Sequence, residues 1–170
     1  GRYNDPRIAN TVIACGKADL VSMGRQSLAD PETPNKAREG RFDDIRTCLG
    51  CHHGCIVTLL GNVPGKCILN PTLGKESEYA DITTADPKKV LVIGAGPGGL
   101  EAAISAASCG HQVKVFDRNR WAGGQFRIGS IPPGKGEIVN FINWQLHQLE
   151  KLGVPVTMNT EVTLDLIKQE

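Results

Sequence analysis

Apolar and polar positions are ordered most regularly after Lys88 in this 170-residue chain. The apolar run in KKVLVIGAG predicts a buried strand, and the alanine-rich PGGLEAAISAASCG predicts a helix. HQVKVFD then alternates apolar and polar residues as a second strand. After a glycine-rich crossover, EIVNFINWQLHQLEKLG has helical spacing and VPVTMNTEV predicts a third strand. This order predicts a parallel sheet with right-handed crossovers.

The first 41 residues also follow a pattern. Residues 5–15 predict a helix capped by Asp5, with Pro6 in its first turn. The apolar stretch from Ala18 to Arg25 predicts a short buried strand, and a second helix should start near Pro34 and end at Gly40. A helix, a buried strand and another helix are typical of part of a parallel α/β layer.

Between residues 42 and 87 no period persists, and GNVPGK and NPTLG are loop sequences. So long an irregular stretch is unusual in a compact domain unless something other than a core organises it. Four of the six cysteines lie here with the spacing C-x2-C-x3-C-x11-C, namely Cys48, Cys51, Cys55 and Cys67. The cysteines are therefore the expected organiser of this segment.

The cysteine spacing bears on three kinds of chemistry. Disulfide frameworks spread their cysteines across a fold, and structural zinc usually takes two pairs of ligands from two knuckles. Three sulfurs from one loop and a fourth from a distance are typical of a 4Fe-4S cluster, with zinc as the alternative. His52 or His53 could replace a thiolate, but four cysteines complete the set. Cys15 and Cys109 are expected to be buried and to serve packing only.

Composition and charge exclude several function classes. A net charge of +1 with no basic run gives no reason to expect nucleic acid or a membrane surface as a partner. No apolar run approaches the roughly 20 residues that a membrane span needs. The chain opens on Gly1 directly into patterned sequence, so we expect a piece of a longer protein, and we expect a cytoplasmic location.

The stretch GAGPGG fits the dinucleotide fingerprint G-x-G-x-x-G, between a predicted strand and a predicted helix. Gly94 suits the tight turn, Gly96 leaves room for a pyrophosphate, and Gly99 lets helix and strand approach closely. The helix N-terminus favours phosphate binding. Asp117, at the end of the next strand, should accept hydrogen bonds from ribose hydroxyls and disfavour the 2′-phosphate of NADP at this site. A purely structural glycine turn is the alternative.

A further glycine pair, Gly123 and Gly124, follows the acidic residue. This resembles the two-dinucleotide-domain flavoproteins, in which the pair lies along the FAD. The resemblance favours FAD over NAD, and it places Val162 beside the adenine.

The cysteine spacing together with VLVIGAGPGGLEAA and GGQF resembles the iron–sulfur flavoenzymes of the old yellow enzyme class, such as 2,4-dienoyl-CoA reductases and enoate reductases. The resemblance covers essentially the whole chain. It implies an α/β protein in which residues 1–41 are the C-terminal end of an FMN-binding (β/α)8 barrel and 42–87 are an irregular 4Fe-4S segment and linker. Residues 88–170 would be the first part of a Rossmann-like FAD/NAD(P)-binding domain, with a partial parallel sheet.

The same resemblance implies the cofactor-binding residues. The FMN phosphate would bind Arg2, Gly24 and Arg25. The FAD would bind Gly94, Gly96, Pro97, Gly98, Gly99, Asp117, Gly124, Gln125, Lys135 and Val162, with one extra residue before Lys135 relative to the family. The catalytic acid and the substrate-binding residues belong to earlier barrel strands, so no catalytic residue is expected in this chain. The NAD(P)H domain should follow Glu170.

The implied activity is an NAD(P)H-dependent reduction of activated C=C bonds in a small enoate or enoyl-CoA substrate. Electrons would pass from NAD(P)H to FAD, to the 4Fe-4S cluster and to FMN. An amine dehydrogenase or demethylase of the trimethylamine dehydrogenase type is one alternative, although that enzyme has two residues between its second and third cysteines. An electron-transfer subunit like the small subunit of glutamate synthase is another, and ADLVSMGR argues against it. A non-catalytic zinc-stabilised module is the fourth possibility.

Overall fold

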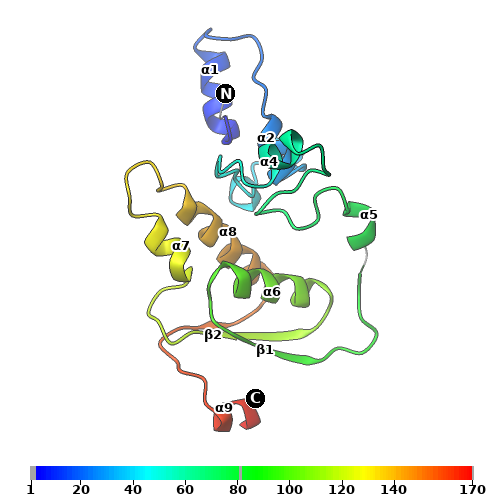
Figure 1. Cartoon of the computed structure of the whole chain (residues 1–170), viewed down its shortest axis with the longest axis vertical. Helices are drawn as coiled ribbons and strands as arrows, with labels where there is room; N and C mark the ends of the chain where they lie inside the picture. The colour runs from blue at the N-terminus through cyan, green and yellow to red at the C-terminus, as the bar shows by residue number, and fades with distance from the viewer. Residues whose placement is uncertain (1–2, 81, 170) are drawn as a thin grey trace. The chain divides into compact units, whose positions relative to one another are not determined.

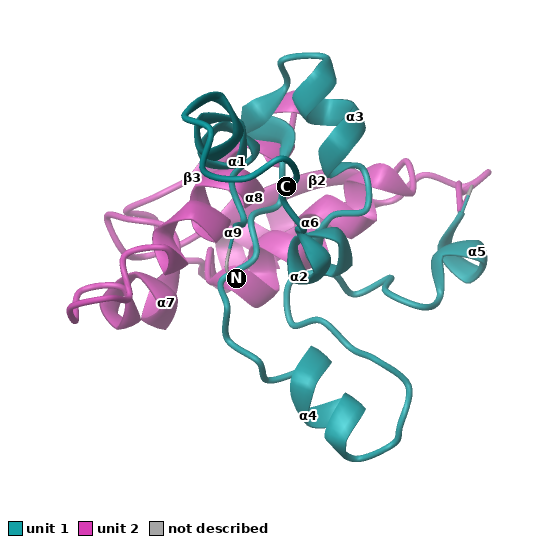
Figure 2. Ribbon diagram, turned by 90° about the horizontal axis from the view of Figure 1, so that it is seen from above, with its two compact units in different colours: residues 1–80 teal, residues 81–170 magenta. Residues whose placement is uncertain are grey.

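The computed structural model describes residues 3–80 and 82–169, and the chain divides into two compact units, Gly1–Ala80 and Asp81–Glu170 (Figures 1 and 2). We describe each unit by itself. Within residues 3–80 and 82–169, each helix is too short or too polar to span a bilayer.

Unit 1, the residues up to Ala80, consists of short helices joined by loops. The helices are α1 (Pro6–Ala14), α2 (Gly24–Ala29), α3 (Thr33–Arg38), the 3-10 turn η1 (Phe42–Asp44), α4 (Cys55–Leu60) and α5 (Glu76–Tyr79). The predicted cap of the first helix is confirmed, because the Asp5 carboxylate accepts a hydrogen bond from the Arg7 N–H at 2.8 Å. The second predicted helix is confirmed as α3, with Pro34 in its first turn.

The strand predicted from Ala18 to Arg25 is wrong for this unit. Residues 18–23 have no regular structure, α2 begins at Gly24, and Leu20 is 87% exposed. A buried parallel strand needs neighbouring strands to bind its backbone N–H and C=O groups. The sheet formed by the described residues lies entirely in unit 2, so this apolar stretch has no strand to pair with.

Unit 2, the residues after Ala80, contains a three-stranded parallel sheet in the order β1-β2-β3. Its elements are β1 (Lys89–Ile93), α6 (Pro97–Ser108), β2 (Gln112–Phe116), α7 (Gly124–Gly129), α8 (Ile138–Lys151), β3 (Val156–Thr157) and α9 (Leu164–Gln169). The predicted strand–helix–strand–helix–strand order is therefore confirmed. The third strand is much shorter than predicted, and α7 and α9 were not predicted.

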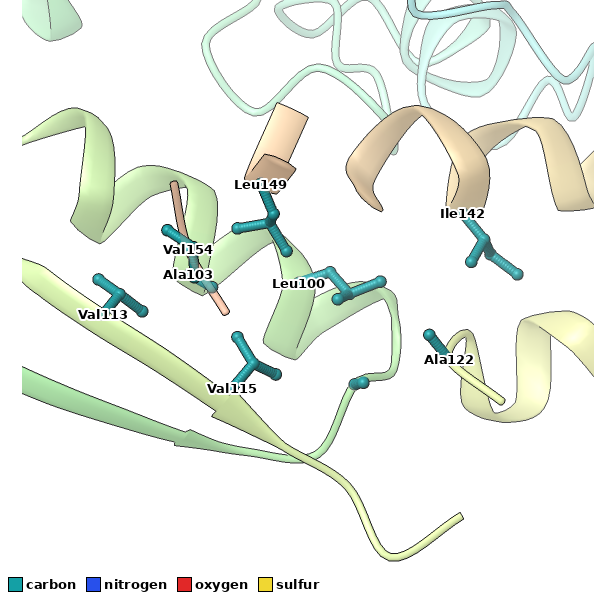
Figure 3. Close-up of a cluster of buried hydrophobic side chains, with 9 residues drawn as sticks. Leu100, Ala103, Val113, Val115, Ala122, Ile142, Leu149 and Val154 are labelled. Carbon is teal, nitrogen blue, oxygen red and sulfur yellow. The ribbon is translucent and has the colours of Figure 1, made fainter. Parts of the chain in front are cut away.

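The core of unit 2 lies between the sheet and the helices α6 and α8 (Figure 3). Leu100 and Ala103 of α6, Val115 of β2, and Ile142 and Leu149 of α8 are each 0% exposed. The alternation along β2 explains this arrangement, because Val113 and Val115 are buried while Gln112 and Lys114 are exposed. The loops that follow β1 and β2 form a candidate site.

Candidate cofactor sites

The four clustered cysteines face one cavity in unit 1. Cys48, Cys51, Cys55 and Cys67 line it together with side chains that include Arg25 and His52. All six cysteines of the chain are free thiols in the structure. The structure therefore brings together three cysteines from one loop and a fourth that lies twelve residues further along the chain.

Gln26 holds the first of these cysteines in place. Its side chain is 1% exposed, and its Oε1 accepts a hydrogen bond from the Cys48 N–H at 2.8 Å. Its Nε2 donates to the Thr33 hydroxyl at 2.9 Å and to the Arg46 carbonyl at 3.1 Å. The Cys48 carbonyl in turn accepts from the Asn4 side chain at 2.7 Å. Both backbone groups of Cys48 are thus fixed by side chains from distant parts of unit 1.

The fourth cysteine approaches the loop because Gly54 has no side chain. A Cβ at Gly54 would lie 2.2 Å from the Lys66 carbonyl oxygen and 3.1 Å from the Cys67 nitrogen. The backbone at Gly54 and the backbone at Lys66 are therefore in direct contact. Cys55 follows Gly54 and Cys67 follows Lys66, so this contact brings the two cysteines near each other. The residues after Cys67 are held as well, since Asn70 donates to the Leu28 carbonyl of α2 at 3.0 Å.

The surroundings of the thiols combine burial with one positive charge. Burial raises the pKa of the Cys48 thiol, and the Gly50 N–H and the Arg25 charge only partly offset this rise. The Gly50 nitrogen lies 3.4 Å from the Cys48 sulfur. Nη1 of Arg25 is in close contact with Nε2 of His52. His52 is one of the two histidines that could replace a thiolate, and in the structure its ring contacts Arg25.

The donor set fits a thiolate-bound group, since sulfur is the ligand preferred by iron–sulfur clusters and zinc. Over residues 3–80 and 82–169, no three His, Cys, Asp or Glu side chains are grouped closely enough to hold a single metal ion. In a 4Fe-4S cluster each thiolate binds its own iron, so the sulfurs need not converge on one point. Four thiols around one cavity meet this requirement.

The other cysteines and the residues expected at the FMN phosphate lie in different surroundings. Cys15 is exposed at the end of α1, so the expectation that it is buried is wrong, because none of the described residues covers this helix end. Cys109 is half-buried at the end of α6. Arg2 lies outside the described residues. Gly24 begins α2 and has open space around it, and Arg25 lines the cysteine cavity.

The glycine loop between β1 and α6 has the geometry that a dinucleotide fingerprint requires. Gly94 has φ +106°, which only glycine adopts readily. A Cβ at Gly99 would lie 2.0 Å from the Gly94 carbonyl oxygen, so helix and strand are in direct contact here. Nothing lies within 4 Å of a Cβ at Gly96 or Gly98. Gly96 therefore leaves an open position before the first turn of α6, whose N1 residue is Pro97.

The second glycine pair lies against this loop. The Gly123 N–H donates to the Ala95 carbonyl at 2.7 Å, and a Cβ at Gly124 would lie 3.4 Å from the Gly96 Cα. Gln125 follows in the first turn of α7 and is exposed, as is Lys135 in the α7–α8 connection. The structure thus places Gly124 directly beside the fingerprint loop.

Asp117 is buried at the end of β2 with most of its acceptor positions in use. Its Oδ2 accepts from the Ala95 N–H at 2.7 Å, and its Oδ1 accepts from the Asn119 N–H and side chain at 2.7 and 2.8 Å. Burial alone would raise its pKa, but these hydrogen bonds and the nearby Arg118 outweigh it and lower the pKa below its usual value. A carboxylate has about four acceptor positions, so one remains for a ligand hydroxyl.

Gly94, Asp117 and Val162 line one cavity beyond the carboxyl ends of β1 and β2. This is the edge at which parallel α/β sheets bind their ligands. Gln125 and Lys135 are not among the residues that line this cavity.

Three residues that matter for these sites were not singled out from the sequence: Gln26, Gly54 and Asn119. The D-x-N spacing could have indicated Asn119, because a carboxylate often accepts a hydrogen bond from the backbone two residues on. Gln26 and Gly54 have no local signal, since their roles depend on segments far away in the sequence.

Comparisons with known proteins find one matching family model and several similar proteins. The family described as FAD dependent oxidoreductase matches residues 89–152. The chain is 44% identical over 158 residues to an NADH oxidase of Thermoanaerobacter brockii, covering 92% of this chain and 24% of the relative. It is 37% identical over 169 residues to a cinnamate reductase of Clostridium sporogenes, covering 99% and 25%. A solved 2-naphthoyl-CoA reductase superposes with a TM-score of 0.93 at 38% identity, covering 99% and 26%.

The fold and the glycine loop thus define a portion of an FAD-dependent oxidoreductase domain. More particularly, the chain belongs to the iron–sulfur flavoenzymes of the old yellow enzyme class. It spans about a quarter of the length of the relatives that it matches.

Proposed function

We propose that this chain is a segment of an NAD(P)H-dependent iron–sulfur flavoprotein oxidoreductase that reduces activated C=C bonds of small enoate or enoyl-CoA substrates. The observation that carries the proposal is the presence of two sites in one chain. Four thiols face one cavity in unit 1, and a glycine loop with a buried carboxylate lies at the sheet edge of unit 2. Residues 1–41 would end an FMN barrel, 42–87 would hold the cluster, and 88–170 would begin the FAD domain.

The thiols of unit 1 would ligate a 4Fe-4S cluster. Their spacing, with three cysteines in one loop and a fourth at a distance, and their arrangement around one cavity support a cluster, with a zinc ion as the alternative. The hydrogen bonds of Gln26 and the Gly54 crossing would keep Cys48, Cys55 and Cys67 at a fixed separation.

The residues of unit 2 would bind FAD. The open position at Gly96 and the free N–H groups at the start of α6 suit the pyrophosphate. The remaining acceptor position of Asp117 suits a ribose hydroxyl, and Val162 would lie at the adenine. Gly124, Gln125 and Lys135 would contact the rest of the FAD. In unit 1, Arg2, Gly24 and Arg25 would bind the FMN phosphate.

When bound, the three groups would supply an electron path from NAD(P)H through FAD and the cluster to FMN and the substrate. The contribution of this chain would be to hold the groups and to set their electrostatic surroundings. The substrate class is supported by the names of two relatives, a cinnamate reductase and a 2-naphthoyl-CoA reductase, which refer to an unsaturated carboxylate and a CoA thioester.

The full-length protein tests the proposal in two steps. Analysis of the purified protein should find iron with acid-labile sulfide, FAD and FMN, whereas zinc without sulfide would refute the cluster. NAD(P)H oxidation should then depend on added enoates or enoyl-CoA thioesters. A response to amines with an artificial electron acceptor, and none to enoates, would favour the amine dehydrogenase alternative.

A matched pair of variants tests the ligand set. Cys55→Ser should abolish the brown cluster absorbance, because a 4Fe-4S cluster of this type uses four thiolates. Cys109→Ser should leave it unchanged, because Cys109 lies in unit 2 at the end of α6. The reverse result would show that the ligands are misassigned.

A further inference from the structure

Arg25 lies in a position that its expected role at a phosphate does not explain. It is the second residue of α2, it is half-buried, and its side chain lines the cavity of the four cysteines. Among the described residues that line this cavity there is no carboxylate and no other lysine or arginine. The positive charge of Arg25 is therefore not opposed by a negative side chain of the cavity wall.

The Arg25 guanidinium is turned toward the cysteine loop. Nη1 of Arg25 contacts Nε2 of His52, which lies between Cys51 and Cys55. His52 has φ +61°, a left-handed conformation that is uncommon for residues other than glycine. Arg25 and Cys48 line the same cavity.

We propose that Arg25 stabilises the reduced form of the cluster and thereby raises its reduction potential, with His52 as the residue that positions the guanidinium. This inference rests on the proposed function, in which the four cysteines hold a 4Fe-4S cluster. It goes beyond that function because it assigns to one side chain the control of how readily the cluster accepts an electron.

The physical reason is electrostatic. Four thiolates make the cluster an anion, and the addition of one electron increases its negative charge. A nearby cation lowers the free energy of the more negative state by more than that of the less negative one. The effect is larger at a partly buried position, where screening by salt is weak. Net charge and exposure are known determinants of cluster potentials.

The experiment uses the full-length enzyme. The midpoint potential of the cluster is measured by titration with dithionite, and the EPR signal of the reduced cluster monitors the titration. Iron, acid-labile sulfide and FMN are quantified in each sample. The variants are Arg25→Met, which removes the charge, and Arg25→Lys, which keeps it. Arg38→Met is the matched control, because Arg38 is exposed on α3, donates to the Asn35 side chain and does not line the cavity.

Arg25→Met is expected to lower the equilibrium constant for cluster reduction about tenfold, which corresponds to a potential about 59 mV more negative for one electron. Arg25→Lys should retain most of the wild-type potential, and Arg38→Met should retain all of it. His52→Asn should shift the potential in the same direction as Arg25→Met but by less. Asparagine tolerates the left-handed backbone, but its shorter side chain loses the contact with Arg25.

The possible failures are distinguishable. A wild-type protein without iron and sulfide would refute the proposed function itself. A cluster whose potential is the same in Arg25→Met and Arg38→Met would overturn the inference. Loss of FMN from Arg25→Met with an unchanged cluster potential would also overturn it, and would leave Arg25 a phosphate ligand only. If Arg25→Met does not assemble a cluster, His52→Asn still gives the test, and an unchanged potential in His52→Asn would overturn the inference.

Discussion

Replacement of Gly54 by alanine tests how the structure brings the fourth cysteine to the other three. The added Cβ would lie 2.2 Å from the Lys66 oxygen, 2.7 Å from its carbonyl carbon and 3.1 Å from the Cys67 nitrogen. Since ordinary contacts of a Cβ begin at 3.4 Å, the two backbone segments must separate by about 1 Å. All three neighbouring atoms belong to the backbone, so no side-chain rotation relieves the clash. Overpacking of this kind costs about 1–3 kcal/mol.

The separation acts directly on the proposed cluster site, because Cys55 follows Gly54 and Cys67 follows Lys66. Gly54→Ala in the full-length protein is therefore expected to lower the iron and sulfide content and to speed cluster loss in a chelator. Gly65→Ala is the control, because nothing lies within 4 Å of its Cβ and Gly65 lies two residues before Cys67. Equal cluster content and equal loss rates in the two variants would refute the reasoning that the Gly54 crossing sets the distance between the two cysteines.

Three further predictions concern unit 2, which contains both tryptophans of the chain, so tryptophan fluorescence during denaturation reports on this unit. Gly99→Ala should destabilise unit 2 by about 1–3 kcal/mol, because the added Cβ would clash with the Gly94 carbonyl. Gly98→Ala should stabilise unit 2 by about 0.4–1 kcal/mol, because its Cβ would enter open space. Equal stabilities of the two variants would contradict the close contact between helix and strand. The lowered pKa of Asp117 means that its stabilisation is present at neutral pH and is lost as the pH falls through the folded-state value. Asp117→Asn should therefore cost about 1–3 kcal/mol at pH 7, and a difference from the wild type that persists unchanged below about pH 4 would refute this. Gly96→Val should leave FMN and cluster contents unchanged but abolish FAD binding, and full retention of FAD would exclude the glycine loop as its site.

Much of unit 2 could be predicted from the sequence because its signals are local. The alternation of β2 and the helical spacing of α8 place Val115, Ile142 and Leu149 on the buried face. The apolar run of β1 forms the predicted strand, but none of its side chains is fully buried and Ile93 is 63% exposed. The third strand is shorter than its sequence suggests. It pairs with β2 only at Val156 and Thr157, and strand length depends on the backbone partners available as well as on propensity.

Unit 1 was harder to predict because its structure depends on distant contacts. The stretch around Leu20 has the sequence of a buried strand, but no described strand lies beside it, and Leu20 is exposed. Helix α4 was missed because its apolar residues do not form a buried stripe, and Leu59 and Leu60 are 72% and 82% exposed. The place of Arg25 in the cysteine cavity follows from how α2 packs against the cysteine loop, and no local pattern contains that information.

The cysteine loop is held by buried polar groups more than by an apolar core. The buried residues of unit 1 include four apolar side chains, Ala9, Ala29, Ile45 and Leu69, but six polar ones, Gln26, Asp30, Thr33, Asp44, Thr58 and Asn70. Hydrogen bonds are directional, so such a network fixes the loop more specifically than apolar contacts would, and each unsatisfied member would cost about 1–3 kcal/mol. A site in which four thiols must face one group needs that geometric control. Because Gln26 and Asn4 hold Cys48 from before residue 41, the expected end of the barrel segment, we infer that the cysteine loop depends on the preceding helices for its geometry.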